Sequence, residues 1–136
     1  MRGLNIGSTG SAGETAALEM YVRNGFKLVA RNYQTKHGEI DLIVRNERYL
    51  VFVEVKTRTK ASYYKWYSSV NHRKKQKLFK TAFSFLEKHK YALQPRFDVI
   101  DVEGHWMVMD DSEQFVVDKL NWYQNAITAG DYDGFI

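Results

Sequence analysis

Two acidic residues stand inside the most apolar stretches of the sequence. Asp41 lies in the segment Glu-Ile-Asp-Leu-Ile-Val at residues 39–44, and Glu54 lies in the apolar segment 49–56. Acidic residues are depleted in strands, and burial of an unpaired carboxylate costs free energy. Each carboxylate therefore needs a cation, a hydrogen-bond network or a metal ion beside it, and the two positions are the first candidates for a chemical site.

The two segments predict a hairpin that would bring these carboxylates face to face. Both alternate in the manner of half-buried strands, and the link Arg-Asn-Glu-Arg at residues 45–48 is short and polar. If Asp41 lies opposite Glu54, the numbers of paired residues add up to 95, and opposed Cβ atoms lie ~4.5–5.5 Å apart. Two carboxylates at that separation repel each other strongly unless a cation lies between them.

A divalent metal ion would remove this repulsion. Carboxylate oxygens suit Mg²⁺, or Mn²⁺, which takes one or two carboxylates together with waters and substrate phosphate. Lys56 follows Glu54 by two residues, so its ammonium points to the same face, within reach of an attacking water or a scissile phosphate. Glu14 lies on the apolar stripe of a helix predicted over residues 13–24, where it either joins this site or only interacts with the helix dipole.

Positive charge is concentrated in the middle of the chain. The net charge is +4, but residues 58–90 contain ten basic residues and one acidic residue, whereas residues 91–136 contain two basic and nine acidic residues. Such a basic segment indicates either a phosphate-binding face or a solvated helix surface. The candidate nucleic-acid contacts are Arg58, Arg73, Lys74, Lys77 and Lys80. Lys74 could equally approach the acidic site or remain a surface lysine.

Hydrophobic periodicity predicts a single α/β domain over residues 13–127, between a flexible leader at 1–12 and a C-terminal tail at 128–136. After the helix at 13–24 we expect a short strand at 26–32, the hairpin strands at 39–44 and 49–56, a long helix at 71–89, and strands at 96–103 and 105–110. Residues 115–127 are ambiguous, with apolar spacing that fits a helix.

Composition excludes several classes of protein. The 136 residues include no cysteine, which rules out disulfides and thiolate metal sites, and the four histidines lack metal-ligand spacing. We expect a cytoplasmic protein, because no apolar run approaches the ~20 residues of a membrane span and no secretory signal pattern is present. No small-molecule cofactor is predicted, since the Gly/Ser-rich stretch at 7–13 lacks the Lys-Ser/Thr ending of a phosphate-binding loop.

The order of these motifs resembles the PD-(D/E)XK nuclease pattern and, more closely, the small bacterial YraN-like family of uncharacterised proteins, over about residues 13–103. The segments that carry the resemblance are Gly-Glu at 13–14, Gly-Phe at 25–26, Arg-Asn-Tyr at 31–33, Gly-Glu-Ile-Asp-Leu-Ile at 38–43, Phe-Val-Glu-Val-Lys-Thr-Arg at 52–58 and Arg-Phe-Asp-Val at 96–99. The family is regarded as a predicted endonuclease branch, similar in fold to Holliday-junction resolvases.

The resemblance implies a restriction-endonuclease-like core, with a central mixed β-sheet flanked by helices. It implies Asp41, Glu54 and Lys56 as catalytic residues, with the Val55 carbonyl and Glu14 as further metal ligands. The expected function is metal-dependent hydrolysis of DNA phosphodiester bonds, with branched or damaged DNA as candidate substrates. A junction-cutting enzyme would need a homodimer to make paired nicks. The alternatives are a non-catalytic nucleic-acid-binding module with the same fold and a protein-interaction domain that uses the acidic segment 91–136.

Overall fold

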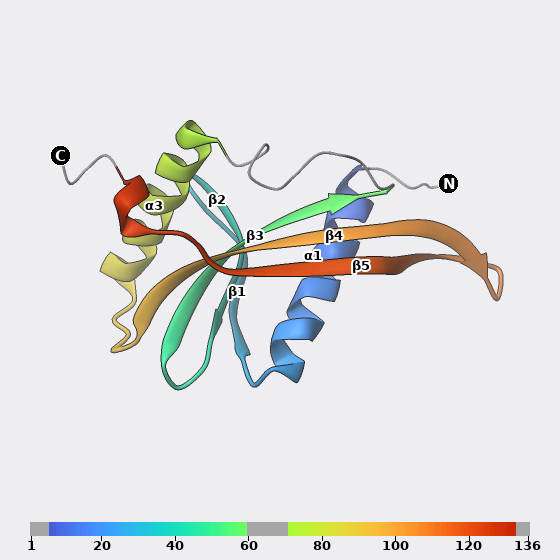
Figure 1. Ribbon diagram of the computed structural model, residues 1–136, viewed down its shortest axis with the longest axis horizontal. Coiled ribbons are helices and arrows are strands. Elements are labelled where there is room, and N and C mark those ends of the chain that lie inside the picture. The colour runs from blue at the N-terminus through green and yellow to red at the C-terminus, as the bar shows by residue number, and fades with distance from the viewer. Residues whose placement is uncertain (1–5, 60–70, 133–136) are drawn as a thin grey trace.

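A mixed five-stranded sheet with helices packed on both faces forms the part of the chain that the computed structural model describes, residues 6–59 and 71–132 (Figure 1). The elements are α1 (Ile6–Arg23), β1 (Lys27–Thr35), β2 (Gly38–Arg45), β3 (Tyr49–Arg58), α3 (His72–Lys88), β4 (Gln94–Met109), β5 (Ser112–Ile127) and the 3₁₀ turn η1 (Ala129–Asp131). The strands follow one another in chain order across the sheet, and only β3 and β4 among them are parallel. The predicted α/β class, with a central mixed sheet flanked by helices, is confirmed.

The β2–β3 hairpin is formed, and its register is the one considered above, in which Asp41 would lie opposite Glu54. Paired residues run from Arg45 and Leu50 at the turn to Leu42 and Val53, and their numbers add up to 95 throughout. The turn is closed by Asn46, whose side-chain oxygen accepts the backbone N–H groups of the two residues that precede Leu50. Because side chains alternate across a strand, this register directs the side chains of Asp41 and Glu54 to the same face of the sheet.

Within residues 6–59 and 71–132, each face of the sheet packs against one helix. On one face, Leu50 and Phe52 pack with Leu78, Phe79 and the other buried residues of α3. On the opposite face, β2, β3 and β4 pack against the α1 residues Ala17, Met20 and Tyr21. Since parallel strands need a crossover connection, α3 returns the chain from β3 to β4 and covers one face on the way. The predicted helix at 71–89 is confirmed, with Asn71 as its N-cap, 2.9 Å from the Lys74 backbone nitrogen.

The first helix begins earlier than the sequence suggests. Residues 6–12, expected to belong to a flexible leader, form the first turns of α1, and residues 1–5 lie outside the described residues. Tertiary contacts account for the difference. Trp106 of β4 donates a hydrogen bond to Thr9 (3.2 Å), and Gly13 approaches β3 so closely that a Cβ atom there would lie 1.8 Å from the Thr57 hydroxyl. Gly13 thus allows the close helix–sheet packing that orders the start of α1.

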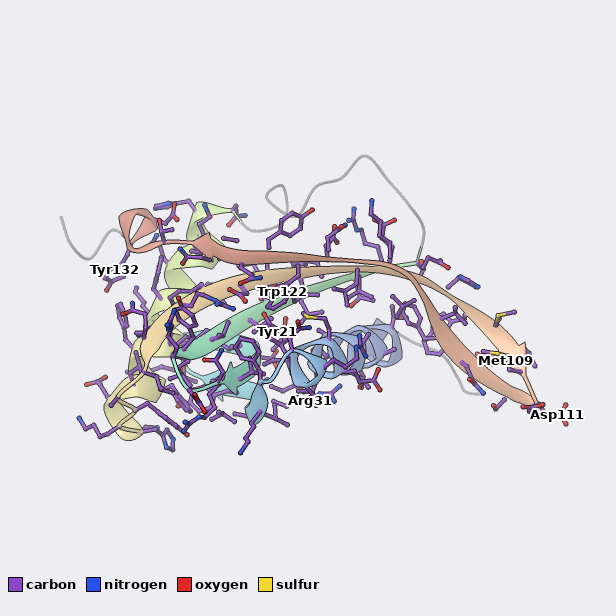
Figure 2. All side chains as sticks on the ribbon, turned by 60° about the horizontal axis from the view of Figure 1, so that its bottom comes forward. Tyr21, Arg31, Met109, Asp111, Trp122 and Tyr132 are labelled. Atoms are coloured by element: carbon purple, nitrogen blue, oxygen red, sulfur yellow. The ribbon has the colours of Figure 1, made fainter. Side chains whose placement is uncertain are left out.

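The end of the chain departs most from the prediction. Residues 94–109 form one strand rather than two, and residues 115–127 belong to a strand rather than a helix. The apolar spacing in β5 resembled a helix because Leu120 and Trp122 pack on the α1 side of the sheet, whereas Tyr123 and Ile127 pack on the α3 side. The sheet register also shifts at Gly104, which breaks simple alternation. The long β4–β5 hairpin extends beyond both helices, with Met109 and Asp111 near its tip (Figure 2).

The start of the expected C-terminal tail is ordered against α3. The Asp131 carboxylate accepts the Thr128 backbone N–H (2.9 Å), and Gln76 donates to the Asp131 carbonyl (2.6 Å). Tyr132 packs against two aromatic rings of α3. Residues 133–136 and the aromatic connection at 60–70 lie outside the described residues. Neither helix in the described ranges has the length and apolar character required to cross a membrane.

Candidate active site

Asp41 and Glu54 meet on the α3 side of the sheet, just beyond the last paired residues of the β2–β3 hairpin. Both line a cavity of about 200 Å³ between the two strands and the beginning of α3. The other lining residues are Gly38, Glu39, Lys74, Lys77 and Leu78. The structure therefore brings together the two acidic residues singled out in the sequence and encloses them with cationic side chains from a different element.

The Asp41 carboxylate is partly buried and anchored to the neighbouring strand. Its Oδ2 atom accepts the backbone N–H of Val55 at 2.7 Å. Burial, as the largest cause, and the charges of Glu54, Glu14 and Glu39 together raise the pKa of Asp41 to about 7, while the Val55 hydrogen bond acts in the opposite direction. Asp41 consequently holds its proton up to about neutral pH when no metal ion is present.

Glu54 is buried and interacts with two lysines from different elements. Its Oε2 atom lies 3.2 Å from Lys56 Nζ of β3 and 2.6 Å from Lys74 Nζ of α3. Burial by itself would lower the pKa of Lys74, but the charge and hydrogen bond of Glu54 raise it above its ordinary value. The contact with Glu54 places Lys74 at the acidic site rather than among the surface lysines, which decides between the two positions that the sequence left open for it.

Glu14 lies near this centre but has other partners. Its Oε1 atom lies 3.3 Å from Arg31 Nε and 3.2 Å from Asn32 Nδ2, so β1 holds the carboxylate. The ion pair connects α1 to β1, as the position of Arg31 beside the helix shows (Figure 2). The effect of Glu14 on the pKa of Asp41 nevertheless places its charge within electrostatic reach of the site. The pairing of Glu14 with Arg31 and Asn32 was not predicted from the sequence, although these two partners belong to a segment that carries the family resemblance.

The donor set suits a magnesium ion bound by few protein ligands. In the described part of the chain, no three or more histidine, cysteine, aspartate or glutamate side chains are grouped to hold a metal ion. Mg²⁺, however, commonly binds through one or two carboxylates and keeps several waters. The Val55 carbonyl is the further oxygen ligand expected from the sequence, and the structure shows that the N–H of the same residue contacts Asp41. Asp41 and Glu54, which line one cavity, are therefore the two carboxylates that would hold such an ion.

The predicted nucleic-acid contacts divide into three groups. Lys74 lies in the site, while Arg73, Lys77 and Lys80 are exposed along α3. Arg58 is instead held on the sheet by an ion pair with Asp101, and Glu103 lies 3.8 Å away. These pairings follow from the parallel β3–β4 register, which sets Arg58 beside Glu103. The exposed α3 residues therefore offer a positively charged surface next to the cavity.

Asp98, which belongs to the last motif of the family resemblance, has a structural role. It is buried on the α1 side of the sheet and accepts hydrogen bonds from Tyr21 (2.8 Å), Arg96 (2.9 and 2.8 Å), Trp122 (2.9 Å) and the Asn125 backbone (2.9 Å). Tyr21 and Trp122 lie together beneath the sheet in Figure 2, with ring centroids 5.3 Å apart. The network ties α1, β4 and β5 together and is separate from the acidic cavity.

Comparison with known proteins gives a consistent family assignment. The model of the family described as "Uncharacterised protein family UPF0102" matches residues 13–102. A UPF0102 protein of Legionella pneumophila is 36% identical over 123 residues, covering 89% of this chain and 95% of the relative. UPF0102 proteins of Caldanaerobacter subterraneus (35% over 127 residues; 93% and 99% covered) and Vibrio vulnificus (38% over 126 residues; 89% and 93% covered) are similarly related. The chain therefore belongs to the UPF0102 family, which is the YraN-like family that its sequence motifs resemble.

Proposed function

We propose that this protein is a metal-dependent nuclease that hydrolyses phosphodiester bonds in DNA. The observation that carries the proposal is the shared cavity of Asp41 and Glu54, in which their proximity helps to raise the pKa of Asp41 to about 7. A pair of neighbouring buried carboxylates is a poor arrangement for stability alone, since each disfavours ionisation of the other. Strongly perturbed groups in a cleft are typical of functional sites.

The chain's own groups can be assigned distinct roles. Asp41, Glu54 and the Val55 carbonyl would hold Mg²⁺ or Mn²⁺, which would lower the pKa of a bound water and offset charge on the phosphate. Lys56, on the same face of β3 as Glu54, would orient the attacking water or stabilise negative charge that develops at the phosphate.

The surroundings of the cavity would hold the substrate. Arg73, Lys77 and Lys80 on the exposed side of α3 would bind flanking phosphates and position the DNA without reading its sequence. Branched and damaged DNA are the substrate classes that we propose to test first. Paired nicks across a junction would require two such sites, and therefore a homodimer.

A non-catalytic nucleic-acid-binding module is the second candidate, and one observation favours it. Both acids already have protein partners, since Glu54 contacts Lys56 and Lys74 and Asp41 accepts the Val55 N–H. Such contacts would stabilise the strands without any metal ion. On this alternative, the basic surface of α3 would bind phosphates and the acids would only maintain the fold.

A cleavage assay separates the two candidates. Labelled single-stranded, duplex, flap and four-way-junction DNA would each be incubated with Mg²⁺, Mn²⁺ or a chelator, using wild type, Asp41→Asn and Lys56→Ala. Metal-dependent cutting that both substitutions abolish would support the nuclease. Absence of cutting, together with salt-sensitive binding that is retained or strengthened in Asp41→Asn, would support the binding module. Glu87→Gln, in the exposed part of α3 near its C-terminal end, is the matched control for loss of one acid.

A further inference from the structure

Two ammonium groups from different elements converge on one oxygen atom of Glu54. Lys56 is part of β3 and lies 3.2 Å from Oε2, while Lys74 comes from the first turn of α3 and lies closer, at 2.6 Å. Lys74 also lines the cavity that holds Asp41. The Glu54 carboxylate, which a divalent ion would need, is thus already neutralised by a cation that the protein itself supplies.

The position of Lys74 is set by the start of the helix. The Asn71 side chain accepts the Lys74 backbone N–H at 2.9 Å, which fixes the residue in the first turn of α3. One turn later, Leu78 and Phe79 are buried in the core against the sheet and prevent the helix from rotating. The backbone therefore directs this side chain toward Glu54, whereas the exposed Lys80 of the same helix is directed to solvent.

We propose that Lys74 is a resident counter-cation of the metal site, which a divalent ion must displace from Glu54 when it binds. The inference rests on the proposed metal-dependent function and adds a form of regulation to it. A divalent ion at Oε2 would lie against the Lys74 ammonium, which is already 2.6 Å from that oxygen, so like-charge repulsion makes the two cations compete for Glu54. Lys74 keeps the buried acid neutralised in the metal-free protein and lowers the affinity for metal.

Displacement leaves Lys74 in the cavity beside Lys77, where a phosphate group is the natural new partner. Metal binding would release a cation for the substrate, and a bound phosphate would hold that cation away from Glu54. By thermodynamic linkage, metal and phosphate each strengthen the binding of the other. The first turn of α3 thereby couples the acidic centre to the nucleic-acid-binding surface.

Calorimetric titration with Mn²⁺, on the full chain without DNA, tests this inference independently of cleavage. Lys74→Met removes the charge but keeps an unbranched side chain, and we expect it to bind Mn²⁺ at least about tenfold more tightly than wild type, ~1.4 kcal/mol. Lys90→Met is the matched control, because Lys90 is exposed beyond the end of α3 and the change in net charge is the same. Lys74→Arg retains a cation and should bind Mn²⁺ as weakly as wild type.

Thermal unfolding followed by circular dichroism would show whether each variant is folded. If Lys74→Met does not fold, Lys74→Gln provides the same comparison between a charged and an uncharged side chain. Equal Mn²⁺ affinity in wild type and the uncharged Lys74 variants would overturn the counter-cation role. If wild type still cut DNA in that case, the proposed function would stand and this inference alone would fail. Absence of Mn²⁺ binding in wild type and in the Lys74 variants alike would overturn both.

Discussion

Replacement of Asp41 by asparagine should stabilise the metal-free protein at pH 8. Asparagine has nearly the same shape and can still accept the Val55 backbone N–H, which lies 2.7 Å from the carboxylate. What the substitution removes is the negative charge that burial and Glu54 disfavour. A change at a candidate catalytic residue is therefore expected to increase stability, as is common where a site accepts strain for function.

The size and sign of the effect follow from the raised pKa of Asp41. The pKa rises from 3.8 to about 7 on folding, and each unit corresponds to ~1.4 kcal/mol. Between these values the folded protein keeps a proton that the unfolded chain has lost, so the free energy of unfolding falls as the pH rises. The free energy of unfolding of the variant should therefore equal that of wild type below about pH 4 and exceed it by about 2–4 kcal/mol at pH 8. The higher figure corresponds to the full shift in the pKa of Asp41.

Urea unfolding of wild type and Asp41→Asn, measured in chelator at several pH values from 4 to 8, gives this difference directly. Glu87→Gln, an exposed acid in α3, is the control and should show no such trend with pH. Addition of Mg²⁺ at pH 8 should stabilise wild type and leave the variant unchanged, because a ligand stabilises only the protein that binds it. A variant that is less stable than wild type at pH 8, or a difference that does not depend on pH, would refute the electrostatic reasoning.

Three further substitutions test the fold and the basic surface. Asp98→Asn should destabilise the protein by about 3–5 kcal/mol in urea unfolding, because Arg96 loses its buried anionic partner. A loss below about 1 kcal/mol would contradict the structural role of the Asp98 network. Gly13→Ala should lower stability by about 1–3 kcal/mol, since its Cβ would lie 1.8 Å from the Thr57 hydroxyl, and an unchanged melting temperature would show that α1 does not pack there. Lys80→Ala should weaken DNA binding similarly on all sequences and reduce the salt slope by about one, as fluorescence anisotropy at several salt concentrations would reveal; an unchanged slope would place the DNA elsewhere.

Much of the central fold could be predicted because its signals are local. The alternating segments at 39–44 and 49–56 and the short turn between them predicted the hairpin, and the structure selected the register that sets Asp41 opposite Glu54. The long helix at 71–89 was also predictable from its local apolar spacing, whereas the structure identifies Asn71 as its N-cap. The β5 strand could not be predicted in this way, because its apolar residues pack on both faces of the sheet. Its extended form also depends on hydrogen bonds to the edge of β4.

The sequence by itself determined the candidate acids, because Asp41 and Glu54 are acidic residues inside two apolar strand segments. Their pairing follows once the register of the hairpin is known. The sequence also placed Lys56, because alternation fixes its face relative to Glu54. Only the tertiary structure decided that Lys74 reaches Glu54 and that Arg58 pairs with Asp101. The first contact depends on how the crossover helix α3 packs on the sheet, and the second depends on the parallel β3–β4 register. Local periodicity contains no information about helix packing or about the register of distant strands.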